Sequence, residues 1–292
     1  MRLNKGLMIS AIALTGVLAL SGCTNSAEEA PEATVEEDVS FEAGTTMAEL
    51  NEAGTITIGT KFDQPLFGLA GPDGTPEGFD VEIGKLIAAK LGIAADDIKW
   101  TETVSKNREP FIQSGDVDLV IATYTINDVR KEVVSFAGPY YEAGQDILVL
   151  AGNPDGIEGI DDLAGKTVCS VTGSTSEKNL VDAGVTVLPA AGYTDCLEPL
   201  RSGAVVAVST DNVILAGLAD QNTGEFEVVG EPFTEEPYGI GLALEDDEFR
   251  SWINDVLTES YEDGSWDEAW ESTAGKVLDT PTPPAVDNYT RP

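Results

Sequence analysis

The alternation of strand-like and helix-like segments after residue 54 restricts this 292-residue chain to a small number of folds. Apolar residues recur at every second position in some segments and at every third or fourth position in others. Strand patterns and helix patterns take turns along the chain, at 55–60, 78–92, 98–101, 107–114 and 117–122. This β-α-β-α-β order is typical of an α/β lobe whose strands are largely parallel.

A second α/β unit follows the first. Its strand patterns lie at 147–150, 185–188, 205–208 and 226–229, and the stretch 161–171 leads into a further strand. A strand at 238–244 leads back to the first unit, which helices at 249–261 and around Trp266 and Trp270 complete. We therefore predict two lobes joined by two crossing segments, lobe 1 at 47–142 and 238–292 and lobe 2 at 143–237. A cleft between such lobes can bury a small ligand from both sides.

The formal net charge of −36 excludes some partners. Nucleic acid and anionic lipid surfaces both require basic patches, so binding to either is not expected. An anionic small ligand is not excluded, because surface charges are screened over about 8–10 Å at physiological salt.

The N-terminus has the pattern of a targeting segment. Arg2 and Lys5 precede an apolar stretch, 7–20, that is too short for a comfortable transmembrane helix. The following Leu-Ser-Gly-Cys resembles a lipobox, which predicts a lipoprotein signal peptide at 1–23 with Cys23 as the lipidated first residue of the mature protein. An ordinary secretory signal with a chance cysteine is the alternative. Residues 24–46 are acidic and predict a disordered tether.

Cys169 and Cys196 are the two remaining cysteines. A leftover pair in an exported protein favours a disulfide, and two buried free thiols are the alternative. A metal site is not expected, because two cysteines without any histidine make half a site.

The stretch TYTINDVRKEVVSFAGPYY, 123–141, follows the buried strand at 117–122. Thr125 and Asn127 are candidate caps of a short helix that holds Arg130 in its first turn. Helix N-termini at strand ends favour anions, and a guanidinium adds a two-pronged partner for a carboxylate. The alternative is an exposed helix arginine.

This stretch resembles the segment of the bacterial extracellular solute-binding proteins of family 3 that contains an arginine and ends in F-(S/A)-x-P-Y-(Y/F). The resemblance extends from Leu50 to Ala269 and is strongest to glutamate/aspartate-binding lipoproteins of amino-acid ABC importers. It implies an α/β, two-lobed, periplasmic-binding-protein-like (type II) fold that closes on its ligand. It further implies a monomer without a cofactor, held outside the cytoplasm by a lipid anchor, that delivers its ligand to an ABC permease.

The resemblance also implies a site for the backbone of an amino acid. Arg130 would clamp the α-carboxylate with Thr125, beside Thr123, and the helix start at Ser174 and Thr175 would grip it from the other lobe. Asp211, which follows the strand at 205–208, would bind the ammonium group. The family's usual aspartate on the preceding strand is Val206 here, and a lone aspartate after a strand is otherwise more often a turn residue or a helix cap.

Specificity for an acidic side chain is implied by two further segments. Lys61 stands where relatives that bind basic amino acids tend to carry aspartate, and Ser105 and Arg108 lie in an S-x-N-R-x-P segment. Two cations and a hydroxyl would form a second anion pocket, unless both cations are solvated at the rim. The resemblance also implies a side-chain contact from Tyr193. Gln64 stands where many relatives have an aromatic residue that stacks on the ligand, and Phe67 is expected to supply part of that wall.

We therefore expect a binding lipoprotein for glutamate or aspartate rather than an enzyme. A binder of a polar amino acid such as glutamine is the first alternative. A dehydratase on the same fold is the second, although the chain has no histidine, which leaves Asp63, Glu109 and Asp211 as possible bases. A sensor ectodomain is a third class, for which the sequence offers no signalling segment.

Overall fold

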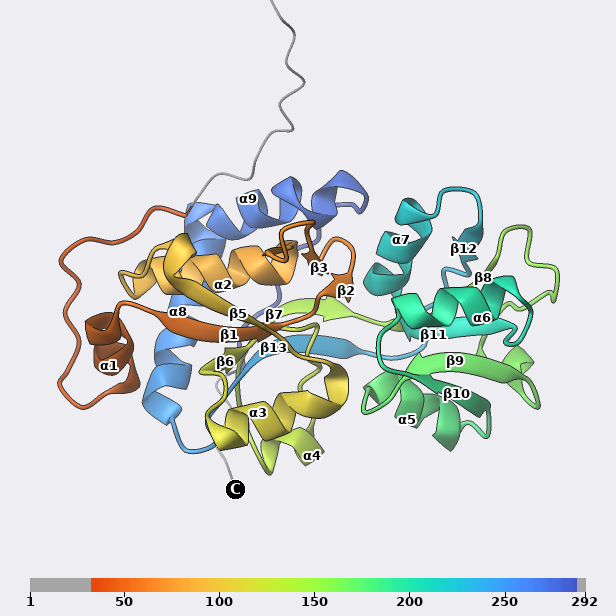
Figure 1. Cartoon of the computed structure of the whole chain (residues 1–292), viewed down its shortest axis with the longest axis horizontal. Coiled ribbons are helices and arrows are strands. Elements are labelled where there is room, and N and C mark those ends of the chain that lie inside the picture. The colour runs from red at the N-terminus through yellow and green to blue at the C-terminus, as the bar shows by residue number, and fades with distance from the viewer. Residues whose placement is uncertain (1–32, 288–292) are drawn as a thin grey trace, which may run out of the picture.

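The computed structural model describes residues 33–287, which form two lobes side by side (Figure 1). Lobe 1 is built on a sheet of order β5-β1-β6-β13-β7, and lobe 2 on a sheet of order β10-β9-β11-β8-β12. The strands of lobe 1 are β1 (Ile56–Thr60), β5 (Ile98–Glu102), β6 (Leu119–Val120), β7 (Ser135–Ala143) and β13 (Glu236–Leu242). Those of lobe 2 are β8 (Gln145–Leu150), β9 (Thr167–Val171), β10 (Thr186–Ala190), β11 (Ala207–Asp211) and β12 (Phe226–Val228).

Parallel pairing occupies one side of each sheet. Strand β1 pairs in parallel with β5 and β6, while β13 runs antiparallel to β6 and β7. In lobe 2, β9 pairs in parallel with β10 and β11, and β8 runs antiparallel to β11 and β12. The predicted two-lobed α/β fold is therefore confirmed.

Helices cover both sheets. In lobe 1, α2 and α9 lie on the opposite side of the sheet from α3 and α4 (Figure 1). The helices of lobe 1 are α1 (Thr46–Ala53), α2 (Phe79–Lys90), α3 (Arg108–Ser114), α4 (Asp128–Lys131), α8 (Asp247–Asp263) and α9 (Ser265–Ser272). Those of lobe 2 are α5 (Thr175–Asp182), α6 (Leu197–Arg201) and α7 (Asn212–Gln221).

Within residues 33–287, two segments connect the lobes, one from β7 to β8 and one from β12 to β13. They touch at Gly144, where an added Cβ would lie 2.7 Å from the Thr234 carbonyl oxygen. One continuous apolar core runs through the junction from Phe67 and Trp270 in lobe 1 to Ile214 in lobe 2. Trp266 and Trp270 are fully buried, so their predicted role in packing is confirmed.

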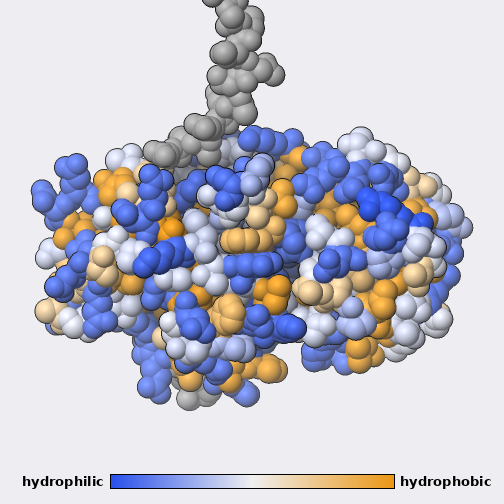
Figure 2. Space-filling view, in the orientation of Figure 1, coloured by the Kyte–Doolittle hydropathy of each residue, from blue (hydrophilic) through white to orange (hydrophobic). Residues whose placement is uncertain are grey.

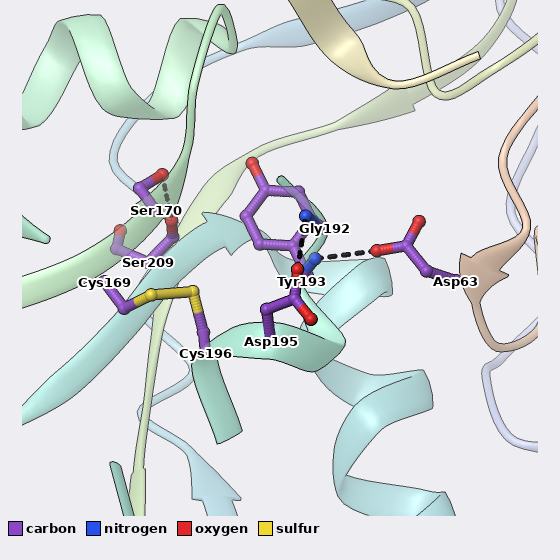
Figure 3. The surroundings of a disulfide bond; sticks show 8 residues. All are labelled: Asp63, Cys169, Ser170, Gly192, Tyr193, Asp195, Cys196 and Ser209. Atoms are coloured by element: carbon purple, nitrogen blue, oxygen red, sulfur yellow. Dashed lines mark hydrogen bonds between the residues drawn. A yellow bond between two sulfur atoms is a disulfide. The ribbon is translucent and has the colours of Figure 1, made fainter. Parts of the chain in front are cut away.

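Lobe 2 contains one disulfide, between Cys169 on β9 and Cys196 in the 3-10 turn before α6 (Figure 3). Polar side chains cover most of the visible face of both lobes, with small apolar areas between them (Figure 2). Within the described residues no helix is long and apolar enough to cross a membrane.

The structure differs from the sequence-based expectations in three local features. The Gly- and Pro-rich loop after β1 contains a small antiparallel sheet of β2 (Asp63–Gln64), β3 (Gly68–Ala70) and β4 (Pro76–Glu77). The apolar run at 117–122 is a strand only at Leu119–Val120. Helix α7 was not predicted, because almost its whole first two turns are apolar and buried, so it lacks an amphipathic period.

The predicted signal peptide, Cys23 and the first part of the expected tether lie outside the described residues. Residues 33–45 of that tether, instead of being unstructured, contact lobe 1. The Glu36 amide donates to the Ala89 carbonyl at 3.0 Å, and Phe41 packs edge-on against Trp252. At the other end, the Asp287 amide donates to the Gly138 carbonyl, so the proline-rich tail lies along lobe 1.

Candidate functional site: a polar cavity between the lobes

A small polar cavity lies between the lobes. Its lining comes from both of them: Gln64, Ser105, Arg108, Thr123, Thr125, Ser174, Thr175, Ser176, Tyr193, Thr210, Asp211 and Ile214. Eight of these twelve had been predicted as site residues. Of the predicted set, Lys61 and Arg130 lie next to the cavity without lining it.

The end of β6 forms one wall of the cavity in lobe 1. Thr123 has a positive φ of 44°, an unfavourable conformation for a β-branched residue. Its amide donates to Asp80 Oδ2 at 2.8 Å and its hydroxyl donates to Gln64 Oε1 at 2.9 Å. Asp80 also accepts a hydrogen bond from the Tyr140 hydroxyl, and burial raises the pKa of Asp80 to about 7. These bonds hold the strained residue in place at the site.

Lys61, Ser105 and Arg108 come together as predicted. Lys61 Nζ donates to Ser105 Oγ at 2.9 Å, and Arg108 donates through Nε to the Ser105 carbonyl. The Arg108 guanidinium also lies 4.2 Å from the centroid of the Tyr124 ring. Lys61 and Arg108 are each only 3% exposed, so the alternative of solvated rim charges is wrong. Burial, with the neighbouring Arg108 cation, lowers the pKa of Lys61 to about 7.

Arg130 lies in α4, whose N-cap is Asn127 rather than Thr125. Its side chain is 7% exposed, so it is not the solvent-exposed helix arginine of the alternative. Nη1 donates to the Thr125 carbonyl at 2.7 Å, Nη2 donates to the Gly173 carbonyl at 3.3 Å, and Nε lies 3.2 Å from Glu109. Arg130 therefore connects the lobes at the outer edge of the cavity.

The start of α5 forms the wall in lobe 2. Ser174 is the N-cap, and its hydroxyl accepts a hydrogen bond from the Glu177 amide at 2.9 Å. Thr175 is the first helical residue. Tyr193 is buried beside the helix start, and its amide donates across the cleft to Asp63 Oδ2 at 2.7 Å (Figure 3).

Asp211 ends β11 and is 4% exposed. Its Oδ2 accepts a hydrogen bond from the Tyr238 hydroxyl at 2.6 Å, whereas its buried Oδ1 has no hydrogen-bond partner within the described residues. Asp211 occupies the N-cap position of α7, but its side chain makes no capping bond, so it does not act as the helix cap of the alternative. Burial, reinforced by the Glu236 carboxylate, raises the pKa of Asp211 to about 7.

Other residues were missed or misplaced by sequence reasoning. Phe67 is not part of the cavity wall, because it packs in the aromatic core of lobe 1 against Phe79 and Tyr238. Ser176, Thr210 and Ile214 line the cavity without having been predicted. Among the residues the structure describes, no cluster of ligating side chains could hold a metal ion.

A two-lobed α/β fold with a polar cavity between the lobes is typical of solute-binding proteins. The family model of the bacterial extracellular solute-binding proteins, family 3, matches residues 56–274. The chain belongs to this family.

Relatives in the family are named for several amino acids, among them glutamate, glutamine and cystine. The chain is 42% identical over 240 residues to the glutamate-binding protein GluB of Corynebacterium efficiens, covering 77% of this chain and 80% of GluB. It is 38% identical to the glutamine-binding protein GlnH of Bacillus subtilis, covering 77% of this chain and 83% of GlnH. A solved structure of an ancestral arginine-binding protein bound to glutamine is similar with a TM-score of 0.70 and 38% identity, over 75% of this chain and 97% of that one.

Proposed function

We propose that this protein captures an acidic amino acid, glutamate or aspartate, between its lobes and delivers it to an ABC permease. The observation that carries the proposal is the charge distribution around the cavity. Buried cations gather on the lobe 1 side at Lys61 and Arg108, and a buried carboxylate oxygen of Asp211 has no partner on the lobe 2 side. A zwitterion with an additional anionic group complements this arrangement.

Asp211 is assigned to the ligand's ammonium group. A buried carboxylate oxygen without a hydrogen-bond partner is costly, because it has lost water without a replacement. An ammonium group donates up to three hydrogen bonds and supplies the opposite charge. Tyr238 holds the other carboxylate oxygen, which leaves Oδ1 for the ligand.

The α-carboxylate is assigned to the boundary between Thr125 in lobe 1 and the α5 start in lobe 2. Ser174 and Thr175 supply a helix N-terminus with its exposed amides, and Arg130 lies next to both lobes at this point. In the closed arrangement Arg130 binds two carbonyl oxygens, and a ligand carboxylate would be a stronger, charged partner for the same guanidinium.

The distal carboxylate is assigned to Lys61, Ser105 and Arg108. Two neighbouring buried cations repel one another, and this repulsion contributes to the lowered pKa of Lys61. An anionic side chain between them would remove the repulsion and favour the charged lysine.

Glutamine is the second candidate ligand. With its pKa lowered to about 7, Lys61 can be neutral near physiological pH. A neutral amine can hydrogen-bond to the amide of glutamine without leaving a buried charge unpaired. The glutamine-binding relative is consistent with this alternative.

Calorimetric titration of the purified protein with glutamate, aspartate, glutamine, arginine and cystine tests the proposal. We expect glutamate to bind at least about 100-fold more tightly than glutamine, because a site built for a charged group rejects a near-isostere that leaves that site unpaired. Tighter binding of glutamine would favour the second candidate. Absence of binding by every amino acid would contradict both.

We also propose that Cys23 carries a lipid that holds the mature, monomeric protein at the outer face of the cell membrane. The lipobox-like sequence before Cys23 supports the anchor, and the extracellular family supports the compartment. A membrane-attached binding protein stays near its permease, which raises its effective concentration there.

A further inference from the structure

Glu236 is a buried carboxylate at the point where β13 begins, and it was not among the predicted site residues. It is 2% exposed. Its Oε2 accepts hydrogen bonds from the hydroxyls of Thr125 at 2.7 Å and Thr175 at 2.8 Å. Its Oε1 accepts from the Thr234 hydroxyl at 2.9 Å and from Asn179 Nδ2 at 3.4 Å. One side chain therefore receives hydrogen bonds from both lobes and from a crossing segment.

The two threonines differ in how they are connected to Glu236. Thr125 forms a β-bridge with Tyr238, two residues along the same strand, so this threonine and Glu236 both belong to lobe 1. Thr175 begins α5 in lobe 2. Movement of lobe 2 away from lobe 1 would break the bond between Glu236 and Thr175 and would leave the bond to Thr125 intact.

We propose that Glu236 is a positioning residue that couples lobe closure to ligand binding. It orients Thr125 and Thr175, which flank the proposed α-carboxylate site, and it adds a charge-assisted hydrogen bond between the lobes that exists only when they are closed. Glu236 does not line the cavity, so it acts through the two threonines and not by touching the ligand. This inference rests on the proposed amino-acid site.

Two double-mutant cycles test this coupling, with glutamate as the titrated ligand. One cycle combines Glu236→Met with Thr175→Val, and the matched control cycle combines Glu236→Met with Thr125→Val. Methionine keeps the length of the side chain and removes both acceptors. We expect Glu236→Met to weaken glutamate binding about tenfold or more, as for loss of a buried charge-assisted bond.

The pattern of additivity distinguishes a closure role from a purely structural one. The effects of the Glu236 and Thr175 substitutions should be non-additive by about fivefold or more, because their bond forms during closure. For Glu236 and Thr125, the loss of affinity in the double variant should equal the product of the two single losses to within about twofold. The reason is that their bond is present before and after closure. Additivity in both cycles, or coupling only in the Thr125 cycle, would overturn the proposal.

A distance measurement separates this inference from the proposed function. Spin labels on exposed Glu132 in lobe 1 and Ala183 in lobe 2, in a Cys23→Ser background, report lobe separation with and without ligand. Even if the parent bound none of the amino acids, Glu236→Met should shift the unliganded distances toward longer values, and Thr125→Val should not. An unchanged distribution in Glu236→Met would overturn the closure role, whatever the ligand proves to be.

Discussion

Asp211 is a buried acid whose ionisation opposes folding until a ligand arrives. Burial, followed in importance by the Glu236 carboxylate, raises its pKa to about 7. A carboxyl group whose pKa is raised on folding destabilises the protein above its unfolded-state pKa of about 4, and the effect is complete above the folded-state value. The destabilisation by Asp211 therefore develops between about pH 4 and pH 7.

We predict that Asp211→Asn stabilises the unliganded protein at pH 8 relative to the parent, by up to about 4 kcal/mol, and leaves stability nearly unchanged at pH 4. Urea unfolding of both proteins at the two pH values measures the difference. Exposed Asp220→Asn is the matched control and should have no effect at either pH. A variant less stable than the parent at pH 8 would contradict the assignment.

Lys61→Asp tests the proposed site for the distal carboxylate of the ligand. A carboxylate beside Ser105 would repel an anionic ligand side chain, so glutamate binding should weaken by about 100-fold or more. Glutamine carries no distal charge, and its affinity should fall by less than about tenfold. Calorimetry with both ligands on both proteins gives the two ratios. Equal losses would place Lys61 outside the side-chain pocket.

Helix α7, which sequence reasoning missed, closes against lobe 1. An added Cβ at Gly217 would lie 2.6 Å from the Pro65 carbonyl oxygen across the cleft. Backbone at that distance cannot move aside as the end of a flexible side chain can. The fit between the lobes at this point therefore requires a residue without a side chain.

Gly217→Ala should separate folding from closure. Alanine in a helix is favoured over glycine by about 0.5–1 kcal/mol, so the melting temperature of the unliganded protein should not fall. The added methyl obstructs closure, so ligand affinity should fall by about tenfold or more. Gly159→Ala, at a position with nothing within 4 Å of the added Cβ, is the control and should retain parental affinity. Parental affinity in Gly217→Ala would show that α7 does not limit closure.

The disulfide joins β9 to the turn that carries Tyr193 toward the cavity (Figure 3). We predict that Cys169 and Cys196 are bridged in exported protein and that replacing both by serine lowers the free energy of unfolding by about 2–4 kcal/mol. Titration of thiols in unreduced, unfolded Cys23→Ala protein tests the pairing. Two free thiols per chain would refute it.

Periodic elements were predictable and uniform ones were not. Helix α2 and strand β1 were found because apolar and polar residues recur in their sequences at helix and strand spacing, whereas α7 is apolar over most of its length. The cations near the cavity were found through resemblance to a family. Glu236 was not, because one glutamate among 52 acidic residues has no local pattern that shows it will be buried.

At the scale of the whole molecule, both ends of the described chain pack on lobe 1. Glu36 and Phe41 attach the N-terminal segment to α2 and α8, and Asp287 attaches the C-terminal tail to Gly138. Lobe 2 carries neither end. Among the described residues, the two crossing segments and the contacts made on closure therefore restrict its movement relative to lobe 1.

Cys23→Ala tests the proposed anchor. The substitution removes the thiol to which a lipid would be attached, so the protein should move from the membrane fraction to the soluble fraction of the culture. Fractionation followed by immunodetection measures the change, with Cys169→Ser as a control that keeps Cys23. A variant that stays with membranes after washing in high salt and carbonate would show that another segment holds the protein there.

Glu236 and Ala143 are directly paired on antiparallel strands, so the chain leaves lobe 1 and re-enters it at a single place. Residues 144–235 are thus placed like an insertion in the loop of a β-hairpin. Without them, a loop of about two residues could connect Ala143 to Glu236. The gene can accordingly be divided at two breakpoints, and the residues encoded at these breakpoints are neighbours in the folded protein. Recombination at these breakpoints would exchange half of the ligand site between family members and leave both chain ends, with their attachments, as they were.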